Sequence, residues 1–178
     1  MRVIGGIYKG RKLVEFKGDS VRPTSDMARE SLFNILRFDV ANATVLDAFS
    51  GTGAVGIEAL SQGAKRVVFN DLSPESVKII KQNLAKIASP SSAEVYQGDA
   101  TSLMKKRAGE FNIIFLDPPY NLDIKKEALA CAFISLKEGG IVILEDEKFF
   151  DGQVEGLDFY DKRKYGRVHF SFFRKGEK

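Results

Sequence analysis

The feature that most constrains the fold is a regular alternation of short apolar runs with segments of helical periodicity from Thr44 onward. This alternation predicts a mostly parallel α/β sheet with helices on both faces. Near the end, residues 157–160 and 167–174 form two extended arms around Tyr165 and Gly166, which predicts an antiparallel hairpin that closes a seven-stranded sheet. The five preceding strands are expected at residues 44–47, 66–70, 94–97, 111–116 and 141–144.

Composition narrows the class of protein. The chain has 178 residues, of which 44% are hydrophobic and 29% charged, which suits one globular domain. No apolar run approaches the length of a membrane span and the amino terminus lacks a signal peptide's apolar core, so we expect a cytoplasmic protein. The single cysteine, Cys131, excludes an internal disulfide and a cysteine-cluster metal site. The single histidine, His169, argues against a histidine-based triad or zinc site. We expect no metal.

Acidic residues follow four successive predicted strands. They are Asp47, Asp71, Asp99 and Asp117. In open α/β sheets the carboxyl edge is where ligands bind, so this repetition indicates a binding site. For a single aspartate the alternative is a loop residue or a helix cap, and Asp99 before Thr101 is a reasonable cap.

A glycine-rich loop follows the first predicted strand. Residues 51–56 spell G-x-G-x-x-G and lead into a helix expected at 54–62, whose amino terminus can offer free N–H groups. In a dinucleotide site the first glycine follows the strand directly, whereas here three residues separate Asp47 from Gly51. A carboxylate there would repel a pyrophosphate but suits the amino and sulfonium groups of S-adenosylmethionine. The predicted cofactor-binding residues are Asp47, Phe49, Ser50, Gly51, Thr52 and Gly53, with Asp71 and Leu72 at the ribose hydroxyls and Asp99 and Ala100 at the adenine amino group.

The fourth strand ends in Asp117-Pro118-Pro119-Tyr120. Proline fixes φ and lacks an N–H, so Asp117 and Pro118 present acceptors while Tyr120 offers a flat ring. Together these groups suit a planar base whose exocyclic NH2 must be held, and we interpret all four residues as catalytic. The alternative is a strand that ends in a proline turn.

The first 22 residues form a basic extension, and the catalytic domain is expected at 23–178. Alternation at 2–4 and 11–14 predicts a small β-hairpin, whose few apolar residues we expect outside the core. Basic residues interleaved with an aromatic suit nucleic-acid phosphates and bases, and the alternative is a solvated extension. The candidate contacts are Arg2, Tyr8, Lys9, Arg11, Lys12 and Arg22.

The string from Arg22 to Asn34 resembles the Arg-Pro-Thr-x-Asp-x-x-Arg-Glu-x-Leu-Phe-Asn signature of the RsmD family. The pieces at 4–6, 10–13 and 47–53 and the Asp-Pro-Pro-Tyr at 117–120 also match. The resemblance implies the Rossmann-like fold of class I methyltransferases and the use of S-adenosylmethionine, with S-adenosylhomocysteine as product. It also implies methylation of guanine N2 in small-subunit (16S) ribosomal RNA, either naked or in an assembling subunit. We expect a monomer.

Two other classes of function stay open. Asp-Pro-Pro-Tyr also fits transfer to adenine N6 or cytosine N4 of DNA, or to a glutamine side chain of a protein. The chain is too small to hold the target-recognition domain that such DNA enzymes carry. A non-catalytic nucleotide- or RNA-binding module is the other class, and it leaves Asp47 and Asp117 without a role.

Overall fold

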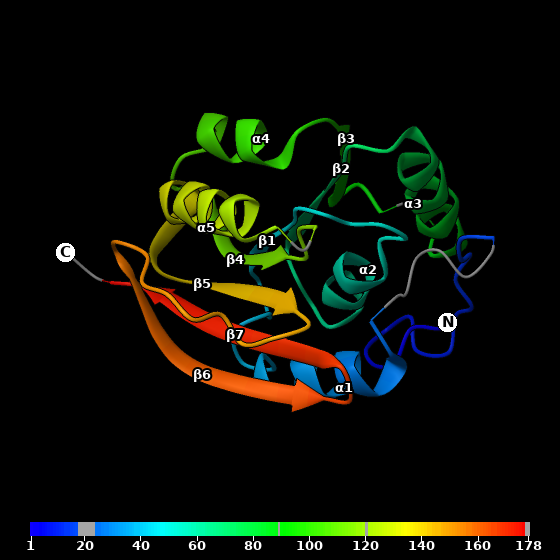
Figure 1. The fold of residues 1–178 in the computed structure, drawn as a ribbon. Coiled ribbons are helices and arrows are strands. Elements are labelled where there is room, and N and C mark those ends of the chain that lie inside the picture. The colour runs from blue at the N-terminus through cyan, green and yellow to red at the C-terminus, as the bar shows by residue number, and fades with distance from the viewer. Residues whose placement is uncertain (18–23, 89, 120, 177–178) are drawn as a thin grey trace.

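The computed structural model describes residues 1–17, 24–88, 90–119 and 121–176. It confirms the predicted seven-stranded α/β sheet (Figure 1). In chain order the elements are α1 (Asp26–Ile35), β1 (Thr44–Asp47), α2 (Ala54–Ser61), β2 (Arg66–Asp71), α3 (Pro74–Lys86), β3 (Ala93–Gln97), α4 (Ala100–Lys106), β4 (Phe111–Leu116), α5 (Leu122–Ser135), β5 (Leu136–Asp146), β6 (Leu157–Tyr165) and β7 (Val168–Lys175).

The strand order is β3-β2-β1-β4-β5-β7-β6. Strands β1 to β5 pair in parallel, and β7 pairs antiparallel with both β5 and β6, which confirms the predicted hairpin. The carboxyl ends of β1 to β5 therefore meet at one edge of the sheet. Strand β6 runs in the same direction as β5, because both are antiparallel to β7, so its carboxyl end lies at that edge too (Figure 1).

Two hydrophobic layers hold helices against the two faces of the sheet. On one face Phe33 of α1, Ile57 of α2 and Ile80 of α3 are fully buried in one cluster. On the other face Met104 of α4 and Leu129 of α5 belong to a second cluster. Helices therefore cover both faces of the parallel part of the sheet, as predicted, and the carboxyl ends of its strands are open to a ligand.

Most helix ends agree with the sequence signals. Ser25 caps α1 by accepting the N–H of Ala28, and Ser73 caps α3 with Pro74 in the first turn. The sequence predicts a helix at residues 125–136, whereas α5 starts three residues earlier at Leu122, because the Asn121 side chain caps it by accepting the N–H of Asp123 at 2.8 Å. Strand β5 starts at Leu136 rather than at residue 141, since its first residues are charged and glycine-rich and hide the apolar pattern.

The described part of the amino-terminal extension, residues 1–17, does form the predicted hairpin, through one antiparallel bridge between Arg2 and Lys12. The expectation that its apolar residues lie outside the core is wrong. Val3 and Leu13 are both buried members of the first hydrophobic cluster. The fully buried carboxylate of Glu58 in α2 accepts the N–H groups of Ile4 and Gly5, at 2.9 and 2.8 Å, and fixes the hairpin on that helix.

Candidate active site

An open cavity lies at the carboxyl edge of the sheet, with about 670 Å³ of empty space that includes its mouth. Its wall is formed by Phe16, Thr24, Leu32, Asp47, Phe49, Ser50, Gly51, Thr52, Ala54, Val55, Phe115, Leu116, Asp117, Ile143, Glu145 and Phe170. Six predicted site residues are among them. The predicted Gly53, Asp71, Leu72, Asp99, Ala100, Pro118 and Pro119 lie outside this wall.

The glycine loop combines tight packing with an open side. Gly53 has a φ of 80° and caps α2, a left-handed conformation that favours glycine. A Cβ on Gly56 would come within 2.3 Å of the Phe69 ring, so only glycine lets α2 approach β2 this closely. Among the residues that the structure describes, a Cβ on Gly51 would meet only the Phe16 ring, at 3.9 Å. The loop therefore leaves space beside Gly51 for a ligand.

Asp47 is a buried carboxylate at the base of the loop. Its side chain is 4% exposed, and its Oδ2 accepts the N–H of Gly56 at 3.0 Å. Burial, together with the nearby charges of Asp71 and Asp117, raises the pKa of Asp47 to about 7. A cationic ligand group in the cavity would stabilise its ionised form.

Asp71 ties the end of β2 to the glycine loop. Its Oδ2 accepts the N–H of Gly51 at 2.8 Å, and its Oδ1 accepts the N–H of Ser73 at 2.9 Å. The next residue, Leu72, is exposed at the same edge. Each carboxylate oxygen can accept a second hydrogen bond, so the proposed contact with ribose hydroxyls remains compatible with these bonds.

Asp99 caps α4, as the alternative interpretation anticipated. Its carboxylate accepts the N–H of Ser102 at 2.7 Å and the hydroxyl of Thr101 at 2.6 Å. These bonds lower its pKa. Its neighbour Ala100 is buried. The adenine contact of Asp99 stays a prediction, and an aspartate that already caps a helix is well placed to keep its charge.

Asp117 follows β4 at the mouth of the cavity, and the residue as a whole is exposed although its carboxyl group is turned against protein atoms. Protein atoms crowded around its carboxyl group, together with the charges of Glu145 and Asp146, raise the pKa of Asp117. Pro118 is buried and Pro119 is exposed. Tyr120 lies outside the described residues.

Two residues that the sequence interpretation missed line the same cavity as Asp47. The hydroxyl of Thr24, just before α1, donates a 2.7 Å hydrogen bond to Oε2 of Glu145 near the end of β5. Burial and the charge of Asp47 raise the pKa of Glu145, and the Thr24 bond partly opposes this. Glu145 also lies near the carboxyl end of a strand, so a search for acidic residues at strand ends would have identified it.

Asn70 is a further missed residue, fully buried at the end of β2. Its side-chain amide donates to the carbonyls of Ala48 and Gly98, at 3.1 and 3.0 Å. It thereby links the loops that follow β1 and β3. A buried amide within an apolar strand was the signal available for it.

The candidate nucleic-acid contacts are distributed over the hairpin. Arg2, Lys9, Arg11 and Lys12 are exposed, and the Arg2 Nε lies 3.7 Å from a carboxylate oxygen of Asp26. Tyr8 is half-buried against the first hydrophobic cluster, so less of its ring is accessible for stacking. Arg22 lies outside the described residues.

Two kinds of feature are absent from the described part of the chain. None of its helices is long and apolar enough to span a bilayer. Within residues 1–17, 24–88, 90–119 and 121–176, no group of three or more histidine, cysteine or acidic side chains is arranged to hold a metal ion.

A family model described as "Conserved hypothetical protein 95" matches residues 1–174. This chain belongs to that family. A relative named Ribosomal RNA small subunit methyltransferase D, from Haemophilus influenzae, is 34% identical and covers 83% of this chain and 79% of its own length. The resemblance to the RsmD family is thereby confirmed.

Solved structures agree with this family's fold. The structure of yhhF from Escherichia coli is 27% identical, has a TM-score of 0.87 and covers 99% of this chain and 98% of that chain. Trm1 from Pyrococcus horikoshii, solved with S-adenosylmethionine, is 20% identical, has a TM-score of 0.73 and covers 93% of this chain and 59% of that chain. The predicted class I methyltransferase fold is confirmed.

Proposed function

We propose that this protein transfers a methyl group from S-adenosylmethionine to the exocyclic N2 amine of a guanine in small-subunit ribosomal RNA. The observation that carries the proposal is that Asp47, Asp117 and Glu145 line one open cavity next to the glycine loop. Three carboxylates in one cavity favour cationic and amine groups over phosphates. The name of the Haemophilus influenzae relative, Ribosomal RNA small subunit methyltransferase D, supports methyl transfer to small-subunit ribosomal RNA.

The residues at the sheet edge fit S-adenosylmethionine. When bound, it supplies a methyl group activated by a positively charged sulfur. We assign Asp47 to the cationic groups of this ligand, since its buried carboxylate is destabilised without one. The space beside Gly51 would receive the ligand, with Phe49, Ser50, Thr52 and Gly53 completing the loop. Asp71 and Leu72 are assigned to the ribose, and Asp99 and Ala100 to the adenine.

The Asp117 motif is assigned to the target amine. The lone pair of guanine N2 is delocalised into the ring, which makes this nitrogen a poor nucleophile. The Asp117 carboxylate and the Pro118 carbonyl would accept its two hydrogens, and Pro119 and Tyr120 would hold the base by packing and stacking. Positioning of this kind contributes several kcal/mol, and stacking roughly 1–3 kcal/mol per base.

Proton balance gives Asp117 its second role. As the new N–C bond forms and the C–S bond breaks, the electron pair of the broken bond stays on sulfur and the amine must lose one proton. The raised pKa of Asp117 suits acceptance of that proton. General-base assistance of this kind is typically worth about 10²–10⁴-fold in rate.

The decisive experiment is methylation in vitro with two substrates, naked 16S ribosomal RNA and small subunits, both from a strain that lacks the gene. Nucleoside mass spectrometry should detect N2-methylguanosine, and Asp117→Asn should abolish it while binding S-adenosylhomocysteine normally. If naked RNA reacts faster, the substrate in the cytoplasm is free ribosomal RNA. If small subunits react faster, the substrate is the assembling particle. Methyladenosine, methylcytidine or methylglutamine instead would contradict the proposal.

A further inference from the structure

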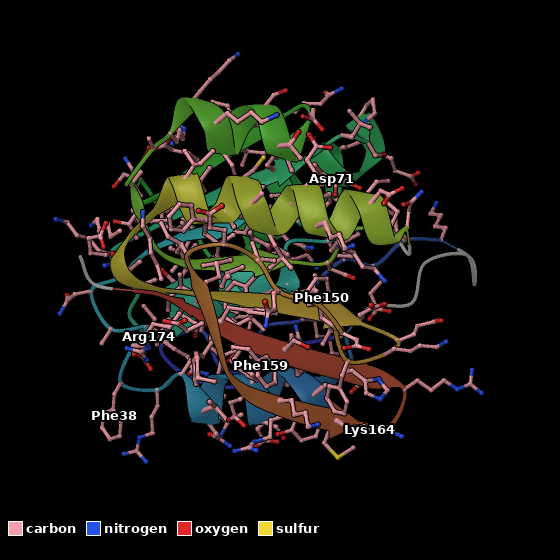
Figure 2. All side chains as sticks on the ribbon, turned by 60° about the vertical axis from the view of Figure 1, so that its left-hand side comes forward. Phe38, Asp71, Phe150, Phe159, Lys164 and Arg174 are labelled. Atoms are coloured by element: carbon pink, nitrogen blue, oxygen red, sulfur yellow. The ribbon has the colours of Figure 1, made fainter. Side chains whose placement is uncertain are left out.

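The hairpin of β6 and β7 brings a second basic surface to the active edge. Asp146, one residue beyond Glu145, is paired with His169 of β7, and His169 is paired with Lys164 of β6. Figure 2 shows Lys164 and Arg174 at opposite ends of the hairpin. The turn of the hairpin is therefore a neighbour of the cavity.

Five residues at this turn form what we call the tip patch: Phe149, Lys162, Lys164, Arg167 and His169. The Lys162 Nζ lies 5.1 Å from the centroid of the Phe149 ring, and the rings of Phe149 and His169 meet edge to face at 4.7 Å. The three cations of the patch are exposed. Among the described residues none forms an ion pair with them, whereas the neighbouring Arg163 pairs with Asp161.

The tip patch and the cavity beside it carry charges of opposite sign. Asp47, Asp117 and Glu145 in the cavity repel phosphate, while Asp146 is already paired with Lys125 at 2.5 Å. Strand β6 lies two inter-strand spacings, or roughly 10 Å, from β5. An RNA chain with one base in the cavity would bring its adjoining phosphates toward this nearby basic surface, where cations can neutralise them.

We propose that the tip patch binds the phosphodiester backbone of the substrate RNA beside the target nucleotide, with Phe149 and His169 beneath an adjoining base. The inference rests on the proposed function, because that function places a nucleotide in the cavity. It adds a second RNA-binding surface to the one expected on the amino-terminal hairpin. The two surfaces are separate, because the amino-terminal hairpin is held on α2 and the tip patch lies at the turn between β6 and β7.

The test compares two triple variants with equal loss of charge. Lys162→Gln, Lys164→Gln and Arg167→Gln together neutralise the tip patch. The control, Lys78→Gln, Lys81→Gln and Lys86→Gln, neutralises three exposed lysines of α3, which packs at the other end of the sheet. RNA affinity at several salt concentrations, kcat, KM for RNA and affinity for S-adenosylhomocysteine are measured for both.

The tip variant should raise the KM for RNA severalfold and leave kcat and S-adenosylhomocysteine affinity unchanged. The slope of log affinity against log salt should fall by up to about 0.7–0.9 for each phosphate that the variant no longer neutralises. The control should match wild type. Should the triple variant lose S-adenosylhomocysteine binding, Lys164→Gln and Arg167→Gln are measured singly, since both side chains are exposed.

A tip variant with wild-type KM and salt slope would overturn the inference and leave the proposed function intact. A defect seen with small subunits but not with naked RNA would also overturn it, because a protein partner would then be the contact. If wild type methylates no ribosomal RNA, the proposed function fails. The salt dependence of RNA binding still tests the patch in that case, since it needs no chemistry.

Discussion

The hydroxyl of Thr24 donates a 2.7 Å hydrogen bond to Glu145, across 121 positions of the chain. The bond joins the start of α1 to the end of β5 and closes one wall of the cavity. It also holds Glu145 in the same cavity as Asp47, and the negative charge of Asp47 contributes to the raised pKa of Glu145.

Thr24→Val should therefore destabilise the fold by about 1.5–3 kcal/mol at pH 8, because ionised Glu145 loses its hydrogen-bond donor. The loss should shrink as the pH is lowered, because protonation of Glu145, whose pKa is raised, removes the charge. Urea unfolding at pH 8 and at lower pH values measures this. Thr101→Val is the control, since it removes the same kind of bond from the exposed Asp99 cap. Equal effects in both variants would contradict a special role for Thr24.

Asp47→Asn should change how stability depends on pH. In the folded protein the pKa of Asp47 is raised from 3.8 to about 7, so folding favours the protonated form. Stability is therefore highest below the unfolded pKa and falls as the pH rises toward 7, by an amount on the order of 4 kcal/mol. The variant should lose this fall while binding S-adenosylmethionine more weakly. Chemical unfolding between pH 5 and 8 would show it, and parallel curves for both proteins would contradict it.

Asp71→Ala should weaken binding of S-adenosylhomocysteine by about 1–3 kcal/mol, or roughly 5- to 150-fold. The ribose would lose an acceptor and the N–H of Gly51 its partner. Asp71→Asn keeps one oxygen for Gly51 and separates the two effects. Calorimetric titration measures the affinities. Unchanged binding in both folded variants would place the ribose acceptor elsewhere.

Asp117→Ala should lower the single-turnover methylation rate by at least about 10²-fold while leaving S-adenosylhomocysteine affinity within a few-fold. The reason is that Asp117 is assigned to the target amine and the glycine loop to the cofactor. Rapid-quench kinetics with radiolabelled methyl donor measures the rate. Near-normal turnover would favour a purely structural strand end.

Neutralising Arg2, Lys9, Arg11 and Lys12 together should weaken RNA binding and reduce its salt slope by up to about 0.7–0.9 per contact. Their exposed positions on a hairpin fixed to Glu58 should keep the fold intact. Filter binding at several salt concentrations tests this, with the α3 triple variant as reference. A salt slope equal to that of wild type would mean that this hairpin is a solvated surface that does not contact RNA.

The sheet and much of the edge were predictable because their signals are local. Apolar runs that end at Asp47, Asp71 and Asp117 mark strands and their open edge together. The loop glycines were recognisable from spacing alone. Gly53 has a positive φ, and Gly56 lies against the ring of Phe69. Few residue types other than glycine can meet either requirement.

The remainder depends on tertiary contacts. The pairing of Thr24 with Glu145 arises from how α1 packs, which no local pattern reports. Val3 and Leu13 stand among basic residues and therefore suggested a solvated hairpin. They are buried because Glu58, more than 40 positions from either residue, accepts hydrogen bonds from the hairpin's backbone and fixes the hairpin on α2.

Strand β6 ends the sheet, so its outer edge offers backbone groups to which another extended chain could add. The irregularity between Phe159 and Asp161 bends this edge, and the cations at 162–164 give it a positive charge that a second copy would share. Bending and repulsion both disfavour edge-to-edge association. Apolar substitutions along β6 should therefore promote aggregation before they unfold the domain.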